Sequence, residues 1–562
     1  MKLWNTYPEA ILLVLGTLFF VPFLGSAPLF DWDEINFAEC AREMIASGDY
    51  FTVTINFVPF WEKPPLFIWM QVLSMKTFGI TEFAARFPNA VCGIITLLVL
   101  FKIGSRVYGK TMGGFWALFY LGSLLPHFYF KSGIIDPWFN LFIFLSVWHA
   151  IRLFNRESEK MNAVLSGLFL GLAILTKGPV AGLIFLLCAA AFFGLGRMKD
   201  IPKISSLMIF SVLALSVSGL WFFILWLSGN GHIISEFITY QIRLFSTEDA
   251  GHGGPFFYHA LLLLGGCFPA SFFALKKSSL MNSTPFSQVM GRSMSILFWV
   301  VLILFSVVKT KIIHYSSLAY FPITFFAARA ALGIAEQKTE IKRLLRSSVF
   351  IFSVLLGLVF SSLPFVNYFR EFMSNSKDPF LAAALTTEVS WQGWEWIGGI
   401  FLIAAGFIWR YGKVIDFPKN LRLLLILNAL AMFVSLAALA PRVELYTQGP
   451  ARAFFESKSG SNCRLGTLGY KSYAHLFYGK VTEGPFDVPS FLTYYKSREK
   501  EIREGLSLQK AWDDWLLYEK PDKEVYFSAK INQGEELKEH PNLDFLYQEG
   551  GYLFFRRKNA DQ

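Results

Sequence analysis

The sequence predicts an α-helical polytopic membrane protein that carries a soluble α/β domain at its C-terminal end. Of its 562 residues, 54% are hydrophobic and only 16% are charged, against about 25% charged residues in an ordinary soluble domain. Residues 441–562 nevertheless carry 36 of the 92 charged side chains. This composition excludes a disordered chain, a coiled coil and a single soluble globule, and it divides the chain near Ala440.

Apolar stretches long enough to cross a bilayer recur throughout residues 1–440. A hydrocarbon core of about 30 Å requires about 20 residues of helix. A short polar link, Thr176-Lys177-Gly178-Pro179, must turn the chain between two of the stretches. We expect about 13 transmembrane helices, over residues 10–29, 88–105, 112–130, 134–153, 162–177, 178–196, 204–228, 257–275, 294–311, 314–335, 346–366, 394–411 and 421–440.

The basic residues predict the orientation of these helices. The tail is neutral, with 18 basic and 18 acidic residues, so the net charge of +10 belongs to residues 1–440. With a cytoplasmic N-terminus, the inner loops hold 22 of the 33 basic residues before residue 441 but only seven of the 23 acidic ones, as the positive-inside rule requires. Thirteen crossings then place the C-terminal domain outside. A basic tail that binds nucleic acid is excluded.

The first external loop, residues 30–87, carries acidic residues at the start of a predicted helix. Apolar residues at helical spacing follow Asp31 and Asp33, so either aspartate would cap an amphipathic helix on the membrane surface. Capping alone would explain both aspartates equally well. Further along, Glu62-Lys63 stands among aromatic residues and before two prolines. At the level of the headgroups this pair suits a lipid phosphate, and the alternative is an interfacial aromatic belt with a solvated ion pair.

Several further cations lie beside apolar segments on the external side. A purely structural charge is costly there, so a functional role is the default interpretation. Lys63 and Arg243 rank first, while Lys309 and Lys311 could simply snorkel at a helix end. Breaking a sugar–phosphate bond would need such fixed cations near the phosphate oxygens.

Over roughly residues 30–320, the sequence contains a series of short motifs in the order found in a known family. Through these motifs the sequence resembles the membrane glycosyltransferases that use polyprenyl-phosphate sugars, which have the GT-C fold and belong to the protein O-mannosyltransferase superfamily. Within them it is most similar to the bacterial lipid A aminoarabinose transferases. The motifs are the Asp33-Glu34 pair, Arg42-Glu43-Met44, Ser47-Gly48-Asp49-Tyr50, Trp61-Glu62-Lys63-Pro64-Pro65, Lys131 to Pro137, Leu175 to Pro179, Gln241 to Phe245, His252 to Tyr258, Lys309-Thr310-Lys311 and His314-Tyr315.

The resemblance implies an architecture and a reaction. It implies a catalytic GT-C domain over residues 1–440, in the bacterial inner membrane, and a periplasmic α/β domain over residues 441–562. The donor would be a sugar linked to polyprenyl phosphate, and the acceptor lipid A or another envelope glycolipid. Membrane lipids would surround the site, and no nucleic acid or nucleotide cofactor is expected.

The resemblance also implies roles for individual residues. Asp33 and Asp136 would be the catalytic carboxylates, with Glu34 beside them. Lys63, Arg243, Tyr315 and Lys177 would contact the donor phosphate. A divalent metal ion is expected near the Glu62-Lys63 motif, with Glu62 and His252 as ligands of suitable type. These two residues lack a spacing signature, and His252 could equally be an ordinary loop residue.

Several alternatives stay open at this point. If the acceptor is a hydroxyl, Asp33 would be the general base that removes its proton. If the acceptor is a phosphate, its oxygen is already ionised and no base is needed. Asp33 would then position the donor sugar, hold a metal or bind an amino group on the sugar. The acceptor could also be a Ser or Thr side chain of a protein. A different class of function is also open, in which the protein transports or flips a lipid-linked saccharide and is not an enzyme. Glu34 and Asn36 depart from the acidic-x-Arg-Tyr form of the aminoarabinose branch, which leaves the donor sugar open.

The C-terminal domain is predicted to contain three strand-like runs and a charged helical stretch. The runs are Cys463 to Gly469, Val525 to Ala529 and Leu543 to Arg556, and the helical stretch surrounds Ser497 to Tyr518. The domain could help to dock the acceptor, or it could be a stabilising cap.

Overall fold

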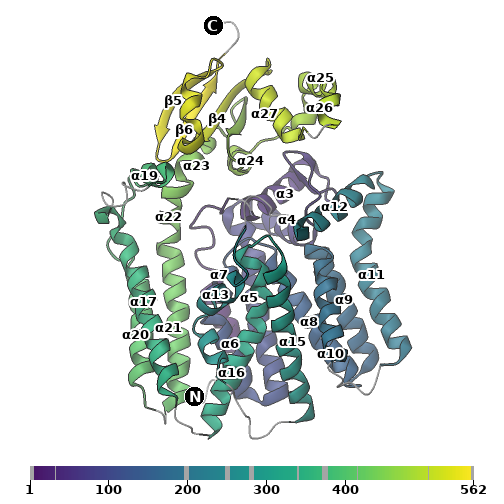
Figure 1. Cartoon of the computed structure of the whole chain (residues 1–562), viewed down its shortest axis with the longest axis vertical. Coiled ribbons are helices and arrows are strands. Elements are labelled where there is room, and N and C mark those ends of the chain that lie inside the picture. Colours follow the sequence, from purple (N-terminus) through teal and green to yellow (C-terminus); the bar gives the residue numbers. More distant parts are fainter. Residues whose placement is uncertain are drawn as a thin grey trace.

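The computed structural model describes residues 6–31, 33–194, 202–246, 253–276, 284–337, 341–369, 377–413, 416–503 and 506–558. Long helices form a bundle, and a mixed sheet lies beyond one end of it, with α3 and α4 between the two (Figure 1). The fold is therefore a helical membrane domain with a small α/β domain, as the sequence predicts.

Eight helical segments within the described residues are long and apolar enough to cross a membrane. Their mean hydropathy follows from runs of Leu, Ile, Val and Phe that are interrupted by few charges. They are α5 (Glu82–Tyr108), α8 (Asp136–Phe154), α9 (Glu159–Lys177), α11 (Ile204–Leu227), α15 (Pro285–Val307), η1 with α16 (Ile313–Ala319, Tyr320–Gln337), α17 with η2 (Arg343–Ser362, Leu363–Phe369) and α21 with α22 (Phe417–Ala438, Ala440–Thr447).

Shorter apolar helices account for other predicted spans. Residues 112–130 and 257–275, each expected to form one helix, are interrupted, the first after Gly122 and the second before Pro269, which has no N–H to continue a helix. The total of thirteen crossings stays a prediction. The shorter helices are α2 (Pro8–Phe20), α4 (Leu66–Phe78), α6 (Lys110–Leu121), α7 (Leu124–Tyr129), α10 (Val180–Gly194), α12 (His232–Ser246), α13 (Tyr258–Gly266), α14 (Ala270–Ala274), α19 (Pro379–Ala384) and α20 (Ile397–Tyr411).

The first external loop folds into α3 (Asp33–Ser47), a hairpin of β1 (Thr54–Ile55) and β2 (Val58–Pro59), and then α4. We expected α3 to lie on the membrane surface with one face exposed. Instead, all residues from Glu34 to Met44 are buried, because the C-terminal domain covers the face that the membrane domain leaves free. Asp33 is the first residue of the helix and not its cap, and the capping position, residue 32, lies outside the described residues.

The C-terminal domain is built on a four-stranded sheet in the order β3-β4-β6-β5. β3 and β4 are parallel and the other pairs are antiparallel. The run from Leu543 to Arg556, expected as one strand, is a hairpin of β5 and β6. The strands are β3 (Cys463–Leu468), β4 (Glu524–Lys530), β5 (Leu543–Glu549) and β6 (Tyr552–Arg557), and the helices are α23 (Gly449–Lys458), α24 (Ala474–Gly479), η4 (Pro485–Asp487), α25 (Pro489–Ser497), α26 (Glu499–Arg503), α27 (Leu508–Tyr518), α28 (Ile531–Gly534) and η5 (Glu535–Glu539).

Residues 473–484 of this domain, here called the docking segment, rest on the first external loop. Tyr478 Oη accepts a hydrogen bond of 2.8 Å from the N–H of Leu29, and Arg42 donates one of 2.6 Å to the Val481 carbonyl. At Gly484 the chains are so close that a Cβ atom would lie 2.4 Å from the Asn56 carbonyl oxygen. The docking segment therefore fixes the loop that carries Asp33.

Candidate active site

Asp136 is the first residue of α8, and the loop before it is held from the side. The Asn89 side-chain amide donates to the carbonyls of Ser132 and Ile134, at 2.6 and 2.7 Å. These bonds use backbone acceptors that a buried loop would otherwise leave unpaired. The Asp136 side chain is only 2% exposed, so a carboxylate is placed in a buried position at a helix N-terminus, where the helix dipole favours negative charge.

Lys177 is the last residue of α9 and pairs with Asp136. Its ammonium group lies 2.6 Å from Asp136 Oδ1. The helix ends there because Gly178 has a φ of +91°, and a Cβ atom at that position would lie 2.8 Å from the Phe237 ring. The predicted polar link between two spans is thus confirmed as a turn, and it places a cation at the end of α9. Lys177, expected at the donor phosphate, is paired with a buried carboxylate.

His314, in η1, joins Asp136 to Asp33. Its Nε2 atom lies 3.3 Å from Asp33 Oδ2 and 3.9 Å from Asp136 Oδ2. Among the described residues, Asp136 Oδ2 is buried and has no hydrogen-bond partner. An unpaired buried carboxylate oxygen is costly, so this atom is available to a proton or a ligand. The Asp33 side chain is 41% exposed and faces more open space.

Tyr315 completes this group, here called the Asp136 cluster: Asp33, Asp136, Lys177, His314 and Tyr315. The Tyr315 ring lies 5.4 Å from the ring of His314, and Lys177 Nζ lies 5.2 Å from its centre. A hydrogen bond of 2.8 Å from Asn140 of α8 to Ser317 holds η1 against that helix. Sequence reasoning gave His314 no role. Its position beside Tyr315 in the His-Tyr motif was the only available signal.

A second group, the Tyr240 cluster, gathers Glu62, Lys63 and Arg243 around one aromatic ring. Lys63 Nζ and Arg243 Cζ lie 5.4 and 5.2 Å from the centre of the Tyr240 ring. Glu62 Oε2 accepts a hydrogen bond of 3.0 Å from the Tyr240 hydroxyl. Lysine and arginine side chains held on one ring are groups of the type that binds a phosphate. Lys63 is also near enough to His314 to interact with it electrostatically, which links the two clusters.

Glu34 does not join the catalytic group in which we placed it. It is 1% exposed and accepts two hydrogen bonds, of 2.8 and 2.7 Å, from the guanidinium of Arg86. It also accepts from the backbone N–H groups of Phe30 and Gly133. Because both oxygens are fully used, Glu34 is a structural residue that ties α3 to α5 and to the loop before Asp136.

Lys311 is likewise structural. Its ammonium group donates to the carbonyls of Phe305, Ser306 and Val308. These carbonyls lie at the C-terminal end of α15, which has no intrahelical donors left for them. Lys311 lies at a helix end, as the alternative interpretation expected, but it does not snorkel: it is buried at 6% exposure and its charge is satisfied inside the protein.

The docking segment contributes a residue that sequence reasoning also missed. The N–H of Tyr473 donates to Asp31 Oδ1 at 3.3 Å. Burial, together with the charges of Glu62, Asp31 and Asp33, raises the pKa of the Tyr473 hydroxyl above its usual value. Tyr473 thus joins the C-terminal domain to the acidic segment that precedes α3.

The described residues do not assemble a metal site. Within them, no group of three or more His, Cys, Asp or Glu side chains is arranged to hold a metal ion. Glu62 is engaged with Tyr240, and His252 lies outside the described residues. The expected pairing of Glu62 with His252 therefore stays a prediction.

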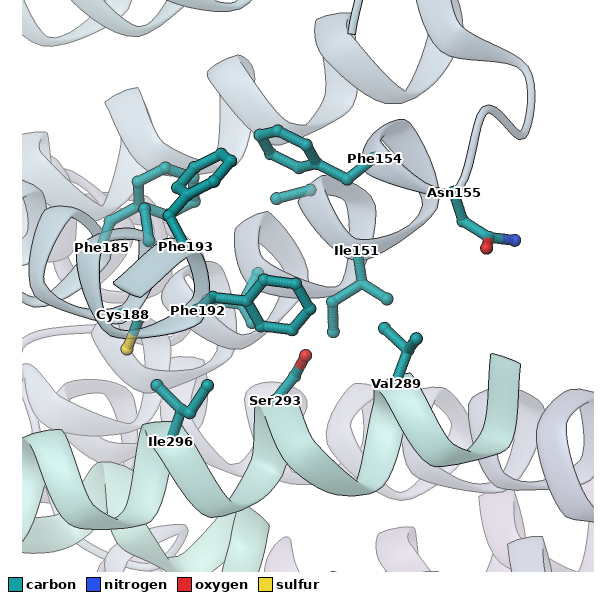
Figure 2. Close-up of a pocket in the computed structure, with 13 residues that line it drawn as sticks. Ile151, Phe154, Asn155, Phe185, Cys188, Phe192, Phe193, Val289, Ser293 and Ile296 are labelled. Carbon is teal, nitrogen blue, oxygen red and sulfur yellow. The ribbon is translucent and has the colours of Figure 1, made fainter. Parts of the chain in front are cut away.

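An apolar cavity of about 210 Å³ lies far from these clusters (Figure 2). Its lining comes from α10, α15 and the C-terminal part of α8, and includes Phe192, Ile296 and Ile151. Ile151 is 15 residues along α8 from Asp136, which corresponds to about 22 Å of helix. The cavity thus belongs to the opposite end of the bundle and is not part of the site.

Comparisons with known proteins agree with this geometry. The family described as dolichyl-phosphate-mannose-protein mannosyltransferase matches residues 62–222. The structure is similar to that of ArnT from Cupriavidus metallidurans, solved with undecaprenyl phosphate, with a TM-score of 0.70 at 16% identity over 99% of both chains. It is also similar to an oligosaccharyltransferase of Archaeoglobus fulgidus, with a TM-score of 0.50 at 12% identity over 95% of this chain and 70% of the other. The chain thus has the GT-C fold of membrane glycosyltransferases.

In sequence, the chain is similar to undecaprenyl phosphate-α-4-amino-4-deoxy-L-arabinose arabinosyl transferases. A relative from Sodalis glossinidius is 24% identical over 97% of both chains. Relatives from Enterobacter sp. and Pectobacterium atrosepticum are 25% and 27% identical, and the matches span 61% and 65% of those proteins. The likeness and the apolar helices together make the chain a multi-pass membrane protein close to the aminoarabinose transferases.

Proposed function

We propose that the protein transfers a sugar from a polyprenyl-phosphate donor to lipid A or another envelope glycolipid, with inversion at the anomeric carbon. The observation that carries the proposal is the meeting of Asp33, Asp136, Lys177 and His314 beside a two-cation cluster. The similarity over 97% of the chain to a transferase named for an undecaprenyl-phosphate-linked aminoarabinose supports the same donor class. A pentose of the aminoarabinose type is the sugar that this similarity favours.

The Tyr240 cluster suits the leaving group. In the reaction, the bond between the anomeric carbon and the phosphate oxygen breaks, its electron pair stays on the phosphate, and the acceptor oxygen bonds to that carbon. Lys63 and Arg243 would stabilise the charge that develops on the phosphate, and fixed cations in a water-poor site do this more effectively than water. Lys177 supports this step indirectly, because it holds Asp136 and lies over the Tyr315 ring.

Asp33 suits contact with the acceptor or the sugar, because it is the exposed carboxylate of the Asp136 cluster. A hydroxyl acceptor would give its proton to Asp33, with His314 holding the carboxylate in place. A lipid A phosphate needs no base, and Asp33 would then bind the amino group of the donor sugar. The buried Asp136 would in both cases orient His314.

The divalent cation remains a separate proposal. Glu62 is a ligand of suitable type for such an ion. Addition and removal of EDTA, followed by metal replacement, would measure whether transfer depends on one.

We further propose that the N-terminus is cytoplasmic and that the C-terminal domain lies in the periplasm of a bacterial inner membrane. The charge distribution along residues 1–440 supports this orientation. A reporter enzyme that is active only in the periplasm, fused after the last residue, should be active, and an inactive, intact fusion would reverse the orientation.

A second acceptor class, protein Ser/Thr, is supported by the description of the family that matches residues 62–222. Mass spectrometry of lipid A, extracted glycolipids and envelope proteins, with and without the gene, distinguishes the two by the added mass. A transporter is less well supported, because the charged pair Asp136–Lys177 lies at the ends of two helices, whereas a transporter is expected to concentrate ionisable groups in broken helices near the midplane.

The reaction is tested with membranes that contain the protein, a polyprenyl-phosphate sugar and lipid A. Asp33→Ala and Lys63→Ala should each abolish transfer without lowering expression. The exposed Lys496, on α25 of the C-terminal domain, offers a matched control, and Lys496→Ala should behave as wild type. Full activity of both site variants would refute the assignment of the site.

A further inference from the structure

We propose that a polar pocket between the C-terminal domain and the β1–β2 hairpin binds a phosphorylated saccharide, namely the headgroup of the acceptor. The inference rests on the proposed function, since it assigns a binding site to the acceptor of that reaction. The pocket has a volume of about 440 Å³. Its lining comes from three places in the chain: the turn of the hairpin at Asn56, residues 458–465, and residues 476–483, with Trp512 and Lys523 at the side.

The charge of the lining is predominantly positive. Four cations line the pocket, and Glu483 is the acidic residue among the lining side chains. The cations are Lys458, Arg464, Lys480 and Lys523. A saccharide without charge would not require this excess, whereas a phosphate is stabilised by such a set of donors.

Two of these cations, Lys458 and Lys480, are available to a ligand, while the other two are engaged in ion pairs. Arg464 pairs with Asp522 at 2.8 Å, and Lys523 pairs with Glu483 at 2.8 Å. In the part of the chain that the structure describes, neither Lys458 nor Lys480 forms an ion pair. Lys480 is exposed and its backbone is in the left-handed region, with a φ of +50°, at the end of α24. Lys458 lies over the Tyr526 ring at 4.0 Å.

The uncharged polar groups of the pocket suit a sugar. Ser461, Asn462 and Thr482 offer hydroxyl and amide groups beside the cations, and such groups can both donate and accept hydrogen bonds. Inorganic phosphate alone would use only the cations. The combination therefore favours a sugar phosphate over a free phosphate.

The pocket lies within reach of the reacting groups. Val481 lines it and accepts the hydrogen bond of Arg42, and Arg42 is nine residues along α3 from Asp33, which is about 14 Å of helix. One headgroup of more than one sugar can span that distance. Its phosphate would occupy the pocket while its reactive group lies at Asp33, so the C-terminal domain would select the acceptor.

The test uses the full chain, purified in detergent, and measures direct binding of phosphorylated lipid A and of the same lipid A after phosphatase treatment. Lys480→Gln and Lys458→Gln should each weaken binding of the phosphorylated form about tenfold and leave the dephosphorylated form unchanged. Lys496→Gln, on the same domain but away from the pocket, serves as the control. Thermal melting of all three variants checks that they fold.

Competition and kinetics separate the remaining explanations. Glucosamine 1-phosphate should compete with the acceptor more strongly than inorganic phosphate, and equal competition would overturn the saccharide part of the proposal. In the transfer assay, Lys480→Gln should raise the KM for acceptor and leave kcat and the donor KM unchanged. Unchanged binding and KM in both lysine variants would overturn the pocket while transfer itself stands. Phosphate-dependent binding without any transfer would instead refute the proposed reaction and leave the pocket in place.

Discussion

Lys177 donates a hydrogen bond of 2.6 Å to Asp136, so that the last residue of α9 is joined to the first residue of α8. Both side chains are largely buried, at 12% and 2% exposure. A buried pair of this kind is costly to break from one side, because the remaining charge has no compensation.

Replacing this lysine should therefore affect both folding and transfer. We expect Lys177→Met to lower the free energy of unfolding by about 3–5 kcal/mol and to remove most of the activity, while Lys177→Arg retains part of both. Thermal unfolding in detergent and initial transfer rates measure the two effects. Wild-type stability and activity of Lys177→Met would show that the pair has no functional role.

Glu34 and Arg86 should behave as structural residues. Glu34→Gln removes one charge of a buried bidentate pair, and we expect a loss of about 3–5 kcal/mol in stability. The double variant Glu34→Leu/Arg86→Met should recover part of the lost stability, because neither charge is then left alone. Expression level and melting temperature provide the measurement. A Glu34→Gln protein as stable as wild type but inactive would return Glu34 to the catalytic group.

His314 should act on the chemical step and not on donor binding. It lies between the carboxylates of Asp33 and Asp136, so His314→Gln should lower kcat by about 100-fold with little change in the donor KM. Lys63→Gln should instead raise the donor KM, because Lys63 belongs to the Tyr240 cluster. Steady-state kinetics at varied donor concentration distinguish these patterns, and a raised donor KM with normal kcat in His314→Gln would contradict the assignment.

Glu43, on α3, should make stability depend on pH. Burial, and then the neighbouring Glu39, raise the pKa of its carboxyl to about 8, while one of its oxygens accepts from Thr54 and Phe57. Because the folded state binds the proton more tightly than the unfolded state, the stabilisation is complete below about pH 4.5 and declines as the pH rises to about 8.

The matching variant is Glu43→Gln, which cannot lose a proton. We expect it to unfold at a nearly constant temperature between pH 5 and pH 9, and at the alkaline end to be more stable than wild type by on the order of a few kcal/mol. Melting temperatures across this range measure the effect. Parallel pH profiles for the two proteins would show that Glu43 does not titrate in the folded state.

The sequence predicts the long helices of this fold well and the pairing of its polar residues poorly. Length and hydropathy identify α5, α9 and α11, since a helix in a bilayer needs little more than an apolar run. The interruption of residues 112–130 and 257–275 depends on single positions. At Gly122 the reason is tertiary, since a Cβ atom would lie 2.5 Å from the Leu425 carbonyl oxygen, and at Pro269 it is the missing N–H.

For the site, too, the sequence predicts which residues take part better than it predicts which residues they contact. Motif order led to Asp33, Asp136, Lys63 and Arg243, and the structure places each of them in one of the two clusters. Pairing across long separations could not be inferred. Glu34 meets Arg86 52 residues away, and spacing gives no hint of that contact. The burial of α3 was hidden for a similar reason, because the covering residues lie more than 400 positions later.

The contacts of the docking segment have a consequence for exchanging parts between relatives. One end of α3 carries Asp33, and the other end donates through Arg42 to the tail. A chimaera that exchanges residues 441–562 alone would rest α3 on a foreign surface and displace the carboxylate along with it. Exchanging residues 30–87 together with the tail keeps the two halves of that contact matched. The unit that can be transplanted is therefore discontinuous in sequence, consisting of one early loop and the last fifth of the chain.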